Sequence, residues 1–364
     1  MLRHALHEFE ADITLTAVSP LLIRDGRVPT EGPEREKLAD KRGREKMPVS
    51  IPISRASWEE VKSAITDPID PMAKVSKLEF YIPGSSMKGC WRSHLERILR
   101  GLTPESDARV CDPLDDAGVD LEMGTTGPCT SCSKILLDKK KKYTNLKKNE
   151  RFPAYAMSCP ICRMFGNATL ASRVTITDAK RVAPGRLIQR EHVAINRKNG
   201  QVANGPFKYF ALQDAKFETR ITIRNYELPH ILLLGALFAD LAGMRIPLGS
   251  GKSKGYGQVR AEPKKLKFTA FGMESPDGPL TGVAEHPRFG KELEGDYRWT
   301  AAPGGGPPLT GWKQVEGSPW RWELVVSTTE FQDLTKQIKL RWDAVPRLDQ
   351  RMAWEPGKAP AWPA

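Results

Sequence analysis

The chain has 364 residues, of which 40% are hydrophobic and 27% are charged, and its formal net charge is +12. This composition excludes wholesale disorder, and no apolar run approaches the roughly 20 residues that span a membrane. Six cysteines are too few for a disulfide scaffold, and the first residues lack the apolar core of a signal peptide, so we expect a cytoplasmic protein.

The positive charge is concentrated in three segments. Residues 139–151, 180–220 and 244–267 each carry a net charge of +6, which leaves the rest of the chain mildly acidic. Basic clusters set in an acidic remainder are typical of surfaces that bind polyanions such as nucleic acids. Lysines on solvated loops would give the same count, so charge alone leaves both interpretations open.

The first third of the chain predicts one strand, a long loop and a helix. Apolar and polar residues alternate over residues 9–17, which indicates a half-buried strand. Residues 24–79 are rich in charge and proline without a sustained period, and predict a long loop with a short helix at 56–65. An apolar stripe at helical spacing predicts an amphipathic helix over residues 84–101.

The ends and faces of this helix can also be predicted. Ser85 or Ser86 can cap its N-terminus, and Gly101 can end it. Lys88 and Arg92 lie four residues apart and therefore share a face away from the apolar stripe. Free backbone N–H groups, two hydroxyls and a lysine at one helix N-terminus form a potential anion site.

The order of elements predicts an α+β fold. Strand, helix, strand, strand, helix, strand is the βαββαβ order of a ferredoxin-like (RRM-like) core. Its later elements are expected as strands at 172–178, 217–223 and 255–270, a buried helix at 229–243, and a hairpin or loop at 190–212 with turns at Lys198-Asn199-Gly200 and Asn204-Gly205-Pro206.

We expect residues 1–270 to form this core and residues 271–364 a C-terminal extension rich in tryptophan and proline. The extension holds seven of the nine tryptophans, with a potential strand at Trp322 to Thr329. We expect it to bury its tryptophans against the main fold; a docking surface is the alternative. The core is expected to carry three large insertions, a loop at 24–79, a zinc-binding insert at 103–168 and a hairpin at 180–212.

Two CxxC turns predict a structural zinc site. Cys129 and Cys132 form the first turn, and Cys159 and Cys162 form the second. Each turn places two thiolates on one edge of a tetrahedron, so two turns complete a four-cysteine zinc site. Cys111 is a possible substitute ligand. A redox-active CxxC is the lesser alternative, because the surrounding sequence lacks a thioredoxin-like pattern.

Residues 249–257 form a glycine-rich basic loop. Lys252 follows a glycine as in a phosphate-binding P-loop, but Ile246 occupies the position of the first glycine and the loop follows a helix. Exposed amides, Lys252 and Lys254 suit a phosphodiester backbone, and Tyr256 could stack on a base. A plain tight turn is the alternative interpretation.

Four segments resemble a known family in the order in which it carries them. Tyr81 to Gly89 resembles its IPGSSLKG segment, and Cys159 to Gly166 is similar to its CxxCRLFG segment. Val174 to Ala179 follows at the family's distance, and Gly249 to Gly257 resembles its C-terminal glycine-rich loop. The family is the RAMP superfamily, and the resemblance is to the backbone subunits of type III CRISPR–Cas effector complexes.

This resemblance implies an RNA-binding subunit of an antiviral ribonucleoprotein. Its partners would be the guide (CRISPR) RNA, the target RNA, and other RAMP-type and large subunits of the complex, without a membrane. A thumb hairpin, for which residues 190–212 are our candidate, would displace a nucleotide of the guide–target duplex. The implied RNA contacts are Ser85, Ser86, Lys88, Arg92, Arg163, Lys252, Ser253 and Lys254, to which we add Asn196 and Arg197 of the hairpin and Tyr256.

The resemblance leaves catalysis open. Active members cut target RNA with Mg²⁺ or another divalent metal and an aspartate in the loop after the first strand. Lys46 stands at the corresponding position here, so Asp70 is our first candidate acid, with Asp67 and Asp25 as alternatives. The protein is therefore either a metal-dependent endoribonuclease or an inactive guide holder whose zinc insert and tryptophan-rich tail dock neighbouring subunits.

Overall fold

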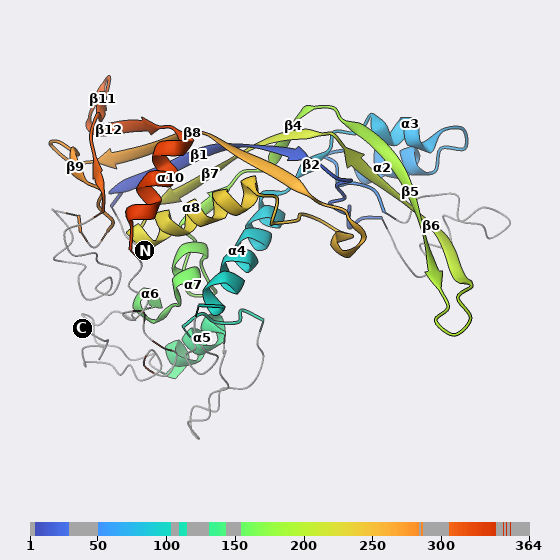
Figure 1. The fold of residues 1–364 in the computed structure, drawn as a ribbon, viewed down its shortest axis with the longest axis horizontal. Coiled ribbons are helices and arrows are strands. Elements are labelled where there is room, and N and C mark those ends of the chain that lie inside the picture. Colours follow the sequence, from blue (N-terminus) through green and yellow to red (C-terminus); the bar gives the residue numbers. More distant parts are fainter. Residues whose placement is uncertain are drawn as a thin grey trace.

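The computed structural model describes most of the chain. The described residues are 4–28, 50–102, 109–114, 131–142, 154–283, 285–286, 306–339, 345, 347 and 350. Figure 1 shows an elongated molecule in which one sheet runs along the long axis, helices cover its lower face, and a hairpin projects downward from one end. The fold is therefore a mixed α+β fold with antiparallel sheets.

The main sheet is centred on β1 (His7–Ala17). Phe9 pairs with Ile223 on one side and with Phe268 on the other, and all three side chains are buried. The strand predicted at 9–17 is confirmed. Along the sheet the strands follow the order β11 (Lys313–Val315), β12 (Ser318–Val326), β8 (Val259–Phe271), β1, β7 (Lys216–Arg224), β4 (Ala179–Ala183) and β2 (Tyr81–Ile82), and β3 (Val174–Ile176) also pairs with β7.

Two long helices, α4 (Gly84–Arg100) and α8 (Leu228–Ala242), lie against the lower face of this sheet (Figure 1). The predicted serine cap of α4 is wrong, because the helix begins earlier and Asp178 accepts the hydrogen bond from the Gly84 amide at 2.9 Å. A Cβ on Gly84 would lie 2.2 Å from the Ile176 carbonyl oxygen, so only glycine allows this helix to start so close to β3.

The shorter helices surround this frame. The short helix predicted at 56–65 is confirmed as α2 (Trp58–Ile65), and a second one, α3 (Pro71–Ser76), follows it. Its six residues are too few to show a helical period, although Asp70 as N-cap and Pro71 at the first position are recognisable start signals. The remaining helices are α5 (Cys132–Lys142), α6 (Ala154–Met157), α7 (Pro160–Phe165) and α10 (Thr328–Gln337).

The predicted hairpin forms a separate two-stranded sheet of β5 (Arg186–Ile195) and β6 (Val202–Gln213). Its tip is the turn predicted at Lys198-Asn199-Gly200, closed by a hydrogen bond from the Asn196 amide to the Gln201 carbonyl. The second predicted turn, at residues 204–206, is wrong, because these residues lie within β6 opposite an irregularity at Ala194.

The described part of residues 271–364 joins the main sheet and its core. β12 pairs along β8, and the ring of Phe331 on α10 stacks on Phe9 at 4.8 Å. Trp322 donates a hydrogen bond to the Met273 carbonyl, whereas Trp320 is 62% exposed. The strand predicted at Trp322 to Thr329 exists but begins earlier and gives way to α10. Two two-residue strands, β9 (Gly278–Pro279) and β10 (Pro308–Leu309), pair nearby.

None of the helices in the described ranges combines the length and apolar character needed to cross a membrane.

A buried imidazole makes the fold sensitive to acid. His7 packs on Tyr226 at 4.1 Å, and burial, with His286 and Arg173 nearby, lowers the pKa of His7 from 6.5 to about 3. Because the unfolded chain binds this proton near pH 6.5 and the folded chain does not, stability falls as the pH drops below 6.5. We expect a loss of about 2 kcal/mol by pH 5 from this group alone, measured by urea denaturation.

A non-titrating replacement isolates this contribution. His7→Gln should unfold with a weaker pH dependence between pH 7 and 5 than the unaltered protein. An identical pH dependence in both proteins would contradict the assignment to His7.

Candidate functional site

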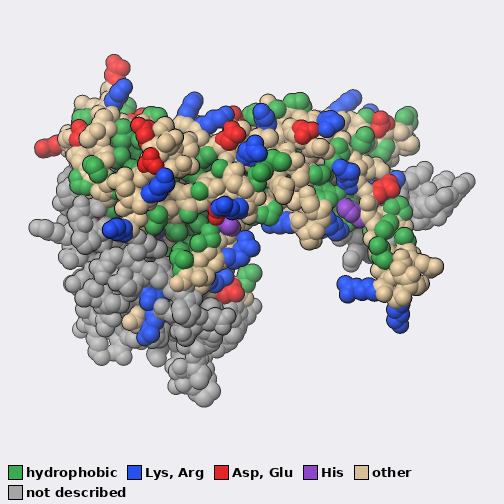
Figure 2. All heavy atoms as spheres, in the orientation of Figure 1, with side chains coloured by type: hydrophobic (Ala, Val, Ile, Leu, Met, Phe, Trp, Pro, Cys, Tyr) green, Lys and Arg blue, Asp and Glu red, His purple; other side chains and the backbone are tan. Residues whose placement is uncertain are grey.

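Three segments far apart in the sequence lie below the main sheet in the view of Figure 1: the N-terminal half of α4, the glycine-rich loop 249–257 and the hairpin β5–β6. Figure 2 shows that the surface is hollowed between α4 and the hairpin, and that lysine and arginine side chains gather there and at the hairpin tip. We call this surface the basic hollow.

The glycines of the loop allow it to pack closely on the neighbouring backbone. Gly249 and Gly257 have φ values of +79° and +81°, and a Cβ on them would lie 2.4 Å from the Leu22 and 2.0 Å from the Leu248 carbonyl oxygen. Between them, Lys252 to Lys254 form an exposed 3₁₀ turn. The loop therefore has a fixed backbone and presents Lys252, Ser253 and Lys254 to solvent.

The loop contacts α4 at Cys90. The Lys252 Nζ lies 3.9 Å from the Cys90 Sγ, which in turn lies 3.3 Å from the Pro247 carbonyl oxygen. Ser85 and Ser86 in the first turn of α4 are exposed. Lys88 is half-buried and donates to the Val174 carbonyl at 3.2 Å, and burial lowers its pKa.

The loop also contacts the root of the hairpin. The His192 Nε2 and the Tyr256 hydroxyl are 2.9 Å apart, and the Lys254 Nζ lies 5.5 Å from the centroid of the Tyr209 ring. The prediction that Tyr256 stacks on a base is wrong, because its side chain is buried beneath the loop and only 6% exposed. Its role is to connect the loop to the hairpin.

The outer part of the hairpin is exposed on all described positions. Asn196 and Arg197 at the turn are exposed as the prediction requires. Val193, Ile195 and Val202 behind them are 45%, 62% and 61% exposed. A projecting hairpin with a basic tip and bare apolar side chains suits insertion between stacked bases.

Arg92 is held by three partners next to the cysteines. Its guanidinium donates to the Glu96 carboxylate at 2.8 Å, to the Gly166 carbonyl at 2.9 Å and to the Cys162 Sγ at 3.2 Å. Burial opposes its charge, but the negative charges of Cys162 and Glu96 outweigh burial and raise the pKa of Arg92. Arg92 thus joins α4 to the cysteines, and its predicted RNA contact stays a prediction.

Arg163 is also a structural residue. It is completely buried, donates to the carbonyls of Ser158 and Ala156, and lies 3.7 Å from the Glu227 carboxylate. Its guanidinium also lies 4.6 Å from the centroid of the Tyr155 ring. A buried, paired guanidinium cannot reach RNA, so this prediction is wrong.

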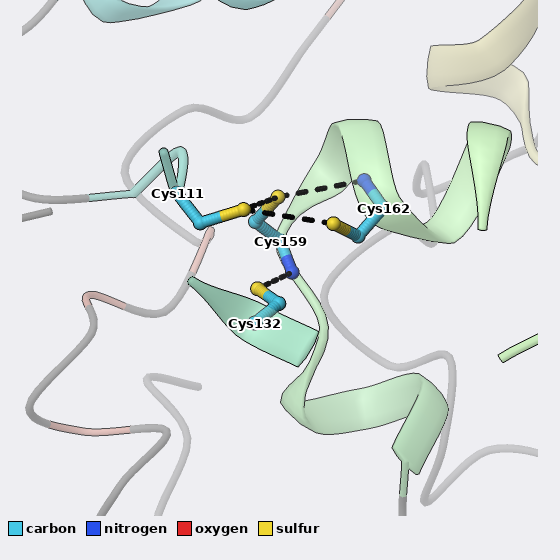
Figure 3. Close-up of side chains that lie close together, drawn as sticks. All are labelled: Cys111, Cys132, Cys159 and Cys162. Carbon is cyan, nitrogen blue, oxygen red and sulfur yellow. Dashed lines mark hydrogen bonds between the residues drawn. The ribbon is translucent and has the colours of Figure 1, made fainter. Parts of the chain in front are cut away.

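Four buried cysteines converge below α4 (Figure 3). The sulfur atoms of Cys111, Cys132, Cys159 and Cys162 all lie within 4.8 Å of one another. Cys111, predicted as a possible substitute, occupies the fourth position, whereas Cys129 lies outside the described residues. We call this set the cysteine cluster.

The cysteine cluster fits a structural zinc ion. The Cys111 Sγ lies 3.5 Å from the Cys159 Sγ and 3.6 Å from the Cys162 Sγ. Zn–S bonds of about 2.3 Å in a tetrahedron require sulfurs about 3.8 Å apart. Hydrogen bonds with Cys132 and the two other thiols raise the pKa of Cys111 well above its usual value, which a bound cation would reverse. The Cys162 amide donates to the Cys159 Sγ at 3.4 Å, as in a metal-binding CxxC turn.

The three candidate acids have structural partners. Asp70 caps α3 by accepting the Ala73 amide at 2.9 Å, and Asp67 accepts the amides of Asp70 and Ile69, which lower its pKa. Asp25 is buried and paired with Arg27 at 2.7 Å. The catalytic role of Asp70 stays a prediction.

Several residues of the site escaped sequence reasoning. Asp178 caps α4 from the connection between β3 and β4, and Glu96 on α4 bridges Arg92 and Arg100 of the same helix. No local signal marks the Asp178 contact, since 94 positions separate Asp178 from Gly84. The Arg92–Glu96 spacing of four residues was the one available indication of a pair on the helix.

Comparison with known proteins identifies the family. The sequence model of the RAMP superfamily matches residues 14–260, which include α4, the cysteine cluster, the hairpin and the glycine-rich loop. No curated protein matches the chain.

Proposed function

The chain belongs to the RAMP superfamily, and on that premise we propose that it is an RNA-holding backbone subunit of a type III CRISPR effector complex. It would bind guide RNA and the duplex of guide with target RNA in the basic hollow. Other RAMP-type and large subunits of the complex would be its protein partners.

The observation that carries this proposal is the convergence of α4, the glycine-rich loop and the hairpin on the basic hollow. Lys252 contacts α4 at Cys90, and Lys254 lies over Tyr209 of the hairpin. Exposed lysines such as Lys252 and Lys254 bind phosphates without reading sequence, which leaves recognition to base pairing as in other RNA-guided systems.

The strand order supports a ferredoxin-like core for this subunit. Along the chain, β1, α4, β3–β4, β7, α8 and β8 follow the βαββαβ order, and in the sheet they stand as β8, β1, β7 and β4. We propose residues 1–270 as this core, with β12 and α10 as its C-terminal extension.

Binding of RNA by the full-length protein tests the function. We expect the purified chain to carry RNA of defined length, seen as excess absorbance at 260 nm, and to rebind guide RNA after high-salt stripping. A chain that purifies without RNA and fails to bind guide RNA at low salt would contradict the proposal.

Cleavage of target RNA is a second candidate function. Asp67 and Asp70 lie in one exposed turn, where the Asp70 amide donates to the Asp67 carboxylate at 2.9 Å, and paired carboxylates suit Mg²⁺. Asp70→Ala should then abolish metal-dependent cleavage and leave guide binding unchanged. Unaltered cut sites would end the assignment to Asp70 and leave Asp67 and Asp25 as candidates. Absence of cleavage by the unaltered protein would favour the inactive holder, which docks its neighbours through the zinc insert and the tail that carries exposed Trp320.

A further inference from the structure

A cavity of about 510 Å³ lies where the loop after β1 meets β2. This size is within the range of about 300–1,000 Å³ typical of small-ligand sites. The segments behind it pair with the hairpin root, since Leu21 bridges to Leu212 and Ser50 to Tyr209. Asp25, Gly26, Arg27, Ile53, Ser54, Arg55 and Tyr81 line it.

Backbone hydrogen bonds fix the walls of the cavity. The Ile53 amide donates to the Ile23 carbonyl at 2.7 Å, and the Asp25 amide donates to the Ile51 carbonyl at 3.0 Å. The Asp25 side chain is 1% exposed and accepts two hydrogen bonds from Arg27, at 2.9 and 2.7 Å. The site is therefore formed before any ligand arrives.

One wall is a stack of two flat groups. The Arg55 guanidinium lies 4.5 Å from the centroid of the Tyr81 ring. Arg55 is held there by Asp178 at 3.3 Å and by Glu79 at 3.7 Å. A planar guanidinium over an aromatic ring offers nucleobases the kind of platform on which they stack.

The charges of the cavity favour a neutral ligand over a phosphate. Each of its two arginines already faces a carboxylate, Arg27 facing Asp25 and Arg55 facing Asp178. A phosphate would have to compete with these carboxylates, whereas a nucleobase brings stacking area and a neutral hydrogen-bonding edge. We infer that the cavity binds an unpaired nucleobase of the bound RNA, stacked against Arg55 and Tyr81.

This inference rests on the proposed function. An unstacked base is stabilised where a pocket offers stacking and hydrogen bonds. The segments behind the cavity pair with the inner part of the hairpin, at Leu212 and Tyr209, so RNA bound along the hairpin would pass beside the cavity.

Photocrosslinking tests the site. Guide-length RNA carrying 4-thiouridine at successive positions is bound to the full chain, irradiated and digested with trypsin. We expect crosslinks from a restricted set of positions to Tyr81, located by tandem mass spectrometry within the peptide 78–88, because this peptide also contains Ser85, Ser86 and Lys88 of the proposed RNA surface. Arg55→Lys keeps the positive charge but removes the planar guanidinium on which a base would stack. It should therefore lower the yield of this crosslink at least fivefold and change RNA affinity less than twofold.

Arg224→Lys is the matched control, because Arg224 is an exposed arginine that pairs with Glu8 on the other face of the sheet. It should leave the crosslink unchanged. Two results would overturn the base-binding role of the cavity and leave the proposed function standing. One is normal RNA affinity without a crosslink to 78–88. The other is a crosslink that persists in Arg55→Lys, as expected if Arg55 contacts a phosphate. A chain that binds no RNA overturns both.

Discussion

We expect the Cys111→Ser variant to lose bound zinc and the Cys129→Ser variant to retain it. The structure completes a set of four sulfurs with Cys111, and a tetrahedral zinc ion takes four ligands. Structural zinc contributes its binding free energy to folding, so we expect Cys111→Ser to lower the free energy of unfolding by about 4 kcal/mol or more. Elemental analysis and urea denaturation of both variants measure the two effects.

Cys90→Ser is the control for this comparison. Cys90 lies on α4 outside the cysteine cluster, and its replacement should change neither the zinc content nor the stability by a comparable amount. Zinc retained in Cys111→Ser and lost in Cys129→Ser would show that the two CxxC turns alone hold the metal, as the sequence first suggests.

The double variant Lys252→Ala/Lys254→Ala should weaken RNA binding roughly tenfold near 0.15 M salt. Both lysines are exposed on a loop whose backbone is fixed by its glycines, so truncation removes charge with little effect on the fold. The slope of log K against log salt should fall by about 1.4, the value for two phosphate contacts on a single strand. Fluorescence anisotropy at four salt concentrations measures both quantities.

Lys264→Ala/Lys265→Ala removes the same charge from the other face of the molecule. These two lysines of β8 are exposed beside Asp12 on the face of the sheet that α4 and α8 leave open. The control should bind RNA within about twofold of the unaltered protein. Equal losses in the two double variants would mean that total charge, and not the basic hollow, governs binding.

The periodic elements of the fold could be predicted because their signals are local. β1 alternates strictly, α4 and α8 carry continuous apolar faces, and the hairpin turn has its own residue chemistry. The six-residue α3 is too short to show a helical period in its sequence. The Gly84 amide at the start of α4 donates to Asp178, and no local sequence pattern predicts this contact.

The existence of a cysteine cluster could be predicted from the sequence, but its four members could not. Spacing identifies the turn at Cys159 and Cys162, whose geometry is local. Cys111 enters the cluster from 48 residues away through the fold, and a lone cysteine carries no spacing signal. From the sequence, Cys111 could be predicted only as a possible substitute ligand.

The positive residues were the hardest to assign. Arg92 and Arg163 look identical in sequence to arginines that bind phosphate, because composition does not reveal burial. Their carbonyl, thiol and carboxylate partners come from α7, α8 and neighbouring loops. Lys252 and Lys254 sit instead on a glycine-rich turn that projects their side chains outward, which is a local property.

The contacts of α4 connect the cysteine cluster to the helix that carries part of the proposed RNA site. Arg92 and Arg100 join its lower half to Cys162 and to the Cys111 carbonyl, while its first turn faces the basic hollow. A metal ion in the cysteine cluster would therefore restrict the same helix that the proposed RNA site uses. Under the proposed function, a coupling between the two sites would be reciprocal, so that metal and RNA would change the affinity of the protein for each other by the same factor. If the metal orders α4, a shortage of metal would weaken retention of the guide.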